Sequence, residues 1–177
     1  MLDFKNLWAK AQTYDGFVAS STKHRALWQG IYQIARLPEW ALAAVPPESE
    51  RRFLVIAEDW CGDASNTVPI LAKLVDAFPG WELRVILRDQ NPEVMDRYLT
   101  NGSRSIPIVI ALDRDFQELG HWGPRPAVLQ DWVMANRPTI PKAELYPQVR
   151  KWYARDRGET TLREVLDAAG ITGVKAA

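Results

Sequence analysis

The sequence predicts a mixed α/β fold in which short buried strands alternate with helices. Residues 53–57 (FLVIA) and 83–87 (LRVIL) are continuous apolar runs, which are typical of strands covered on both faces. A helical stretch at 63–78 lies between them. Residues 106–112 and 116–122 flank a turn rich in acidic residues, which is the pattern of an antiparallel hairpin. We therefore expect parallel strands connected by a helix, followed by a hairpin.

The N-terminal region is expected to be helical. Residues 20–37 carry apolar side chains at helical spacing, and the hydroxyl groups of Ser20 and Ser21 stand where they can cap the helix. Residues 46–50 (PPESE) are polar and begin with proline, which is typical of a linker. Residues 1–50 are therefore predicted to form an N-terminal helical extension.

The core is predicted over residues 51–136, in the order βαβαββα. A short helix is expected at 92–99, between the second and third strands. A longer helix is expected at 126–135, because a proline at its first position has the backbone angle that a helix start needs. This order gives one mixed sheet with helices packed against it.

A C-terminal helical extension is predicted for residues 137–177. Residues 141–153 place Leu145, Val149 and Trp152 in helical register. A capping box begins a last helix at residue 161, and a glycine at residue 170 ends it. We expect the two extensions and the core to form one compact domain.

Composition excludes several classes of protein. Lys and Arg together number 22 and so do Asp and Glu, so the formal net charge is zero and no general field attracts nucleic acid or an anionic membrane. One cysteine cannot form a disulfide within the chain, and two histidines make a Cys/His zinc site improbable. No leader and no long apolar segment is seen. We expect a cytoplasmic protein that binds no metal, nucleic acid or membrane. The sequence does not indicate its oligomeric state.

The strongest local feature is the sequence EDWCGDA at residues 58–64, between a predicted strand and the first turn of a helix. Free N–H groups and the helix dipole at this position stabilise a thiolate, so we expect Cys61 to be a solvent-reachable thiol, and a small buried apolar residue is the alternative. Asp63 acts in the opposite direction, because its charge beside the sulfur raises the thiol pKa. Asp63 either accepts hydrogen bonds from the first helical turn or takes part in proton transfer.

A second feature is Pro107, which begins the third core strand and has no N–H for the sheet. A cis peptide bond is one reason for a proline at this point. The topology brings Cys61 and the backbone of Ile106 to one sheet edge, where both can face one ligand. Arg104 is expected to pair with Asp63, stabilise a thiolate or receive a ligand carboxylate, and an ordinary surface arginine is the alternative.

Other residues near the motif have simpler interpretations. Arg125, between two prolines at a helix start, either recognises an anion or braces the turn. Glu58 and Asp59 are expected to be solvated surface charges. Most of the eight tryptophans should pack in the core, whereas Trp60 is expected near the surface, where it can pack against a ligand.

These features together resemble the thioredoxin superfamily. The WCG sequence after an apolar strand, Pro107 and the closing hairpin carry the resemblance, which covers about residues 51–136. The sequence WCGDA, with the later segment FQELGHWGPRP, is similar more narrowly to bacterial thioredoxin-like proteins with that motif. The resemblance implies that Cys61 is the attacking cysteine, Trp60 the aromatic residue before it, and Pro107 the cis-proline beside which an extended substrate binds.

The sequence also departs from the family pattern. The resolving cysteine falls on Ala64, the proline between the two cysteines on Asp63, and the buried carboxylate on Val55. One thiol cannot close an intramolecular disulfide. The resemblance therefore implies a monothiol disulfide oxidoreductase that acts on protein or small-molecule disulfides, with glutathione or another small thiol as resolving co-substrate and no other cofactor. It predicts an exposed, acidified Cys61. The alternative is a redox-inactive binding module that recognises a peptide or protein partner in the groove beside Pro107.

Overall fold

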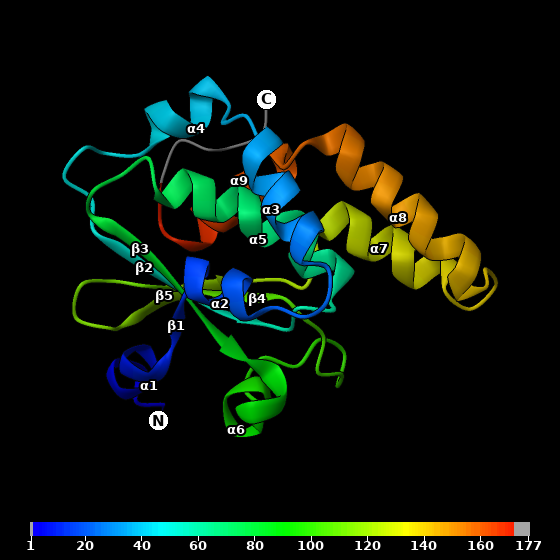
Figure 1. The fold of residues 1–177 in the computed structure, drawn as a ribbon, viewed down its shortest axis with the longest axis horizontal. Coiled ribbons are helices and arrows are strands. Elements are labelled where there is room, and N and C mark those ends of the chain that lie inside the picture. Colours follow the sequence, from blue (N-terminus) through cyan, green and yellow to red (C-terminus); the bar gives the residue numbers. More distant parts are fainter. Residues whose placement is uncertain (1, 172–177) are drawn as a thin grey trace.

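A computed structural model describes residues 2–171 of the chain. Its strands form one mixed sheet at the centre of the molecule (Figure 1). They are β1 (Gln12–Thr13), β2 (Arg51–Ala57), β3 (Trp81–Leu87), β4 (Ile108–Leu112) and β5 (Glu118–Trp122). The order across the sheet is β1-β3-β2-β4-β5. The predicted fold class is therefore confirmed.

Strand β2 is the centre of the sheet. It pairs in parallel with β3 and antiparallel with β4, and β4 continues into the antiparallel hairpin with β5. Every residue from 53 to 57 is buried, because helices or loops cover both faces of this strand. The predicted parallel pair and the closing hairpin are confirmed.

Helices surround this sheet. Among them, α3 and α5 pack together, α9 contacts both α5 and β5, and α1 and α6 lie on the other side of the strands in Figure 1. None of the helices within residues 2–171 is long and apolar enough to cross a membrane. They are α1 (Phe4–Lys10), α2 (Tyr14–Ser20), α3 (Arg25–Ile34), α4 (Glu39–Ala44), α5 (Gly62–Val75), α6 (Pro92–Met95), α7 (Ala127–Asn136), α8 (Lys142–Asp156), α9 (Glu159–Ala168) and the 3₁₀ turn η1 (Arg88–Gln90).

The N-terminal region differs from the prediction in two ways. The helix predicted at 20–37 forms only over residues 25–34, as α3. A separate helix, α2, ends at Ser20, and there the hydroxyl group of Ser21 donates to the carbonyl of Phe17 instead of capping α3. The residue before α3 is His24, which has a left-handed backbone and makes no side-chain cap. The region is also not purely helical, because β1 adds an edge strand antiparallel to β3.

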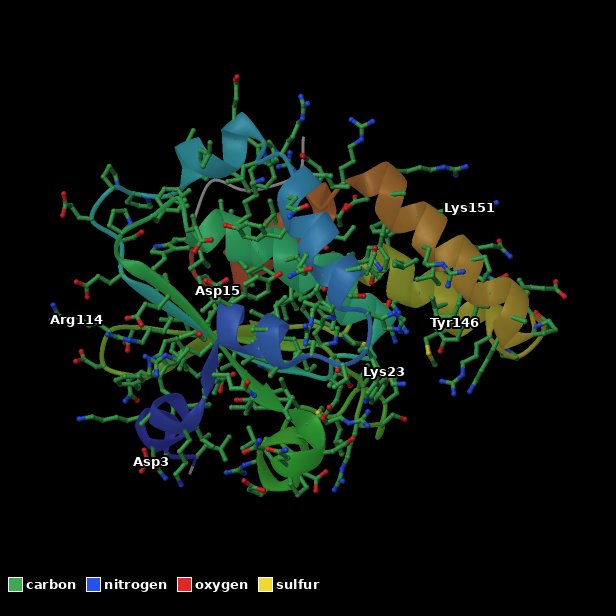
Figure 2. The ribbon with its side chains drawn as sticks, in the orientation of Figure 1. Asp3, Asp15, Lys23, Arg114, Tyr146 and Lys151 are labelled. Carbon is green, nitrogen blue, oxygen red and sulfur yellow. The ribbon has the colours of Figure 1, made fainter. Side chains whose placement is uncertain are left out.

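The α7–α8 hairpin extends to one side of the molecule (Figure 1) and has an apolar cluster of its own. The cluster is separate from the main core, which lies on the two faces of the sheet. Figure 2 shows Tyr146 and Lys151 on opposite sides of α8. The buried members of the cluster are Leu129, Val133, Leu145, Val149 and Tyr153.

Candidate functional site

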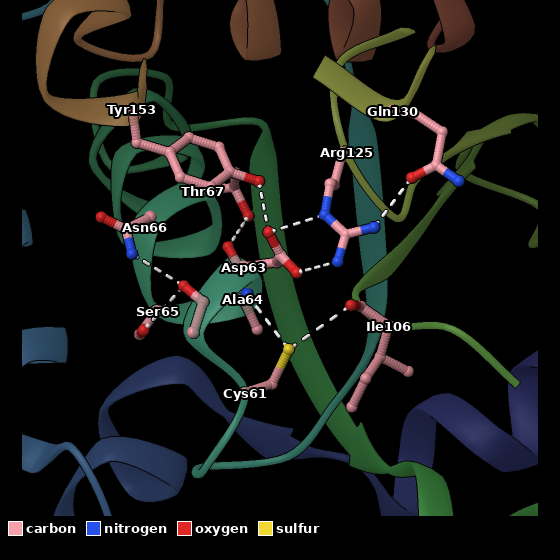
Figure 3. A network of polar contacts seen from close by, with 11 residues as sticks. Cys61, Asp63, Ala64, Ser65, Asn66, Thr67, Ile106, Arg125, Gln130 and Tyr153 are labelled. Atoms are coloured by element: carbon pink, nitrogen blue, oxygen red, sulfur yellow. Dashed lines mark hydrogen bonds and ion pairs between the residues drawn. The ribbon is translucent and has the colours of Figure 1, made fainter. Parts of the chain in front are cut away.

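The thiol of Cys61 lies where β2 ends and α5 begins. Its Sγ accepts a hydrogen bond from the N–H of Ala64 and donates one to the carbonyl oxygen of Ile106, both at 3.4 Å (Figure 3). The predicted meeting of Cys61 with the Ile106 backbone is thus confirmed. Cys61 is only 7% exposed, so the expectation of an exposed thiol is wrong. The chain just before β4, which contains Ile106, contacts the sulfur and lies where solvent would otherwise reach it.

The surroundings of Cys61 favour the neutral thiol. Burial raises its pKa to about 11, and the nearby charge of Asp63 acts in the same direction. The N–H groups of Ala64 and Asp63 and the guanidinium of Arg125 lower the pKa, with a smaller total effect. The sequence left the sign of this shift open, and the pKa is raised because the desolvation of a thiolate outweighs the helix N-terminus here.

Asp63 is the centre of a buried polar network (Figure 3). Arg125 donates to it through Nε, 2.9 Å from Oδ1, and through Nη2, 2.6 Å from Oδ2, while the hydroxyl group of Tyr153 donates to Oδ1 at 2.9 Å. A third nitrogen of Arg125 donates to Gln130. This bidentate pair is largely withdrawn from water, so its hydrogen bonds compensate two buried charges. Asp63 thereby joins α5, the loop after β5, and α8.

Arg104 is the surface arginine that was the predicted alternative. Its side chain is exposed and forms a bidentate ion pair with Asp96, at 2.7 and 2.8 Å, rather than a pair with Asp63. The reason is that Arg125 already occupies both oxygens of Asp63. Arg104 is nevertheless one of the residues that line the cavity beside Cys61. Arg125 itself contacts Asp63 and Gln130, and it also lines the cavity.

The first two residues of the EDWCGDA motif are not the solvated surface charges that we predicted. Glu58 is buried and accepts the N–H of Asp89 at 2.9 Å, and burial raises its pKa. The carboxylate of Asp59 accepts the N–H groups of Thr22 and Lys23, at 2.7 and 2.9 Å. Both carboxylates therefore fix neighbouring loops around the motif. No group of three His, Cys, Asp or Glu side chains within residues 2–171 is arranged to hold a metal ion.

A cavity of about 610 Å³ opens beside the thiol. Cys61, Asp63 and Ile106 line it together with the loop before β4 and the side of α7 and α8 that faces α5. Trp60 also lines it and is 45% exposed, which confirms its predicted place at the surface. The guanidinium of Arg88 lies 4.9 Å from the centre of the Trp60 ring, in a cation–π contact. This volume is in the range of known small-molecule and peptide pockets.

The cis peptide bond between Ile106 and Pro107 lies against a second loop, the end of the segment FQELGHWGPRP. Gly123 in this loop has a φ of +134°, and a Cβ atom there would stand 2.1 Å from the carbonyl oxygen of Pro107. Only glycine fits such an approach. The close packing of Gly123 on Pro107 brings Arg125, two residues later, to Asp63.

Tyr153 and the cavity-facing side of α8 were also missed. The predicted helical register groups Trp152 with Leu145 and Val149. In the structure Tyr153 is buried with these two residues, and Trp152 is partly buried beside them. A strict spacing of four residues would have identified Tyr153. The sequence carries no signal that its hydroxyl group reaches Asp63, because the two residues are 90 positions apart.

Comparison with known families agrees with this geometry. A family model described as thioredoxin matches residues 11–143. The chain belongs to the thioredoxin family. The match begins well before the 51–136 core and ends just inside α8, so β1 to α4 are part of the family pattern and most of α8 and α9 lie beyond it.

Two solved structures share the fold of this thioredoxin-family protein. A protein of unknown function from Pseudomonas aeruginosa has a TM-score of 0.78 at 21% identity, covering 96% of this chain and 98% of the other. An HIV epitope scaffold has a TM-score of 0.76 at 20% identity, with the same coverage. No curated protein matches the chain. At these identities the likeness extends to the fold alone.

Proposed function

We propose that this thioredoxin-family protein is a binding module, and that a peptide or protein partner enters the cavity beside Cys61 and Pro107. The observation that carries the proposal is the hydrogen bond from the Cys61 thiol to the carbonyl of Ile106. A thiolate in this place would face the lone pairs of that carbonyl oxygen without a proton between them. Because disulfide exchange begins with a thiolate, the resting site is unsuited to it.

The cavity itself supports a binding role. The Asp63–Arg125 pair is neutral as a whole and holds the loop after β5 beside α5, while the hydrogen bond from Tyr153 to Asp63 holds α8 there. One side of the cavity is therefore fixed before a ligand arrives. A preformed cavity loses less conformational entropy on binding than a flexible one. We also propose that the protein is cytoplasmic. We further propose that it belongs to the narrower group of bacterial thioredoxin-like proteins with the WCGDA motif.

A monothiol oxidoreductase is the second candidate, since Cys61 lines the cavity and its sulfur accepts the N–H of Ala64. In that reaction the Cys61 thiolate attacks one sulfur of a substrate disulfide, a mixed disulfide forms, and the other sulfur leaves as a thiolate. The thiolate of an external thiol such as glutathione then attacks the substrate sulfur of the mixed disulfide, so that a new disulfide joins glutathione to the substrate and Cys61 leaves as a thiolate. Asp63 would accept the proton of Cys61, with Trp60, Arg104, Ile106 and Pro107 holding the substrate.

Mass spectrometry after incubation with oxidised glutathione separates the two candidates. At neutral pH we expect the folded protein to form no glutathione adduct while the urea-unfolded chain forms one. The unfolded chain is the control for intrinsic thiol reactivity. Rapid adduct formation by the folded protein, lost in Cys61→Ser, would overturn the binding proposal and support the oxidoreductase.

A further inference from the structure

The charges around the cavity are strongly unequal. Among residues 2–171, six Lys or Arg side chains line it but only one carboxylate, that of Asp63. The chain as a whole has a formal net charge of zero, so this excess is local. The six cations are Arg88, Arg104, Arg125, Arg137, Lys142 and Arg150.

Three of these cations have a carboxylate partner and three have none. Arg88, Arg104 and Arg125 pair with aspartates. The other three are Arg137, Lys142 and Arg150, which form no ion pair with any residue of the part of the chain that the structure describes. All three are exposed and lie on the α7–α8 hairpin. One side of the cavity therefore offers three cations to a ligand.

Exposed apolar side chains lie among these cations. Trp60, Met134 and Tyr146 are 45%, 42% and 43% exposed, and all three line the cavity. Aromatic residues, methionine and arginine are the residue types enriched at protein interfaces. A small inorganic anion would leave these apolar surfaces in water. An occupant that covers them must carry apolar groups as well as negative charge.

We infer that the cavity binds an acidic peptide segment with an apolar anchor, its carboxylates on Arg137, Lys142 and Arg150 and its anchor on Trp60, Met134 and Tyr146. The inference rests on the proposed binding function and specifies its partner. Lys142 and Arg150 belong to the same helix. Eight residues of helix span about 12 Å. About four residues of extended peptide cover the same length, so carboxylates at i and i+4 of the peptide match the two cations.

Fluorescence anisotropy with the full chain tests this inference. The probe is a short fluorescein-labelled peptide with glutamates at i and i+4 and a leucine between them. We expect it to bind, and we expect the same peptide with lysine for glutamate, or with serine for leucine, to bind at least about tenfold more weakly. The double variant Arg137→Glu/Arg150→Glu should weaken binding of the acidic peptide by a similar factor.

Lys151→Glu is the matched control. Lys151 is exposed, adjacent to Arg150 in sequence, and lies on the other side of α8 from Tyr146, which lines the cavity (Figure 2). The Lys151→Glu variant should bind the acidic peptide as tightly as the unmodified protein does. Equal weakening by both variants, equal binding of the lysine peptide, or displacement of the probe by inorganic pyrophosphate at similar concentration would overturn the inference. These outcomes would overturn the assignment of the ligand alone, because the glutathione-adduct experiment tests the proposed function separately, against the oxidoreductase.

Discussion

At the scale of single residues, burial and a carbonyl oxygen decide the chemistry of Cys61. The helix N-terminus supplies the N–H of Ala64, as its position between strand and helix would suggest. The same topology brings the Ile106 carbonyl to the sulfur, 45 residues away in sequence. Desolvation then raises the pKa to about 11. The thiol of this site is therefore a protonated, weakly hydrogen-bonded group at the bottom of a cavity.

This shift links stability to alkaline pH. The pKa of Cys61 rises from its ordinary value of 9.0 to about 11 on folding, so between these values the folded chain keeps a proton that the unfolded chain has lost. The contribution of the Cys61 thiol to the free energy of unfolding is fully present below pH 9. It falls by about 3 kcal/mol as the pH rises to about 11. Urea denaturation should show a smaller alkaline loss in Cys61→Ala than in the unmodified protein. Identical pH profiles of the two proteins would contradict the shift.

The hydrogen bond from Tyr153 to Asp63 can be tested separately. Tyr153→Phe removes the hydroxyl group that donates to a buried carboxylate. We expect the free energy of unfolding to fall by about 2 kcal/mol, the usual value for a hydrogen bond to a charged group. Tyr146→Phe is the control, because Tyr146 is an exposed tyrosine of the same helix, and it should change stability little. Equal urea midpoints for Tyr153→Phe and Tyr146→Phe would show that the hydrogen bond is not stabilising.

The sequence predicted which residues form the site better than it predicted which of them pair with each other. Cys61, Asp63, Trp60 and Ile106 lie together around one cavity, because the motif and Pro107 mark the ends of neighbouring strands. The choice of Arg125 over Arg104 as the partner of Asp63 depends on how two loops pack in space. Local spacing carries no information on such a choice, and a bidentate contact needs both distance and orientation.

At the scale of elements, long apolar strands were predictable and short N-terminal elements were not. β2 and β3 show as continuous apolar runs, and the α7 and α8 helices show helical spacing. β1 has only two residues, too few for any periodic pattern, and it forms because β3 offers an edge. The break between α2 and α3 arises from the carboxylate of Asp59, which binds the N–H groups of Thr22 and Lys23. That residue lies far away in sequence.

The loop after β5 gives a test at this scale. Gly123→Ala would place a Cβ atom 2.1 Å from the carbonyl oxygen of Pro107, in a backbone conformation that alanine rarely adopts. We expect a loss of about 2 to 4 kcal/mol in the free energy of unfolding. Urea denaturation measures it. Gly30→Ala, in α3 with open space around it, should not destabilise the protein, and a similar loss there would contradict the argument.

At the scale of the whole molecule, the site lies between two apolar clusters. The main core holds the sheet, α3, α5 and α9, and the α7–α8 hairpin has its own core. The ion pair and hydrogen bond of Asp63 connect the hairpin to α5. The cavity is therefore formed where the main apolar core meets the α7–α8 hairpin, and the hairpin supplies the charges that we assign to ligand recognition.

The proposed binding role depends on Cys61 being a protonated thiol within the cavity. The pH dependence of Cys61 alkylation, with the urea-unfolded chain as reference, measures this protonation state, because the sequence contains only one thiol to report. We predict slow alkylation of the native protein, with a midpoint above that of the unfolded chain and near 11. Rapid labelling with a midpoint below that of the unfolded chain would show a stabilised thiolate and contradict the claim.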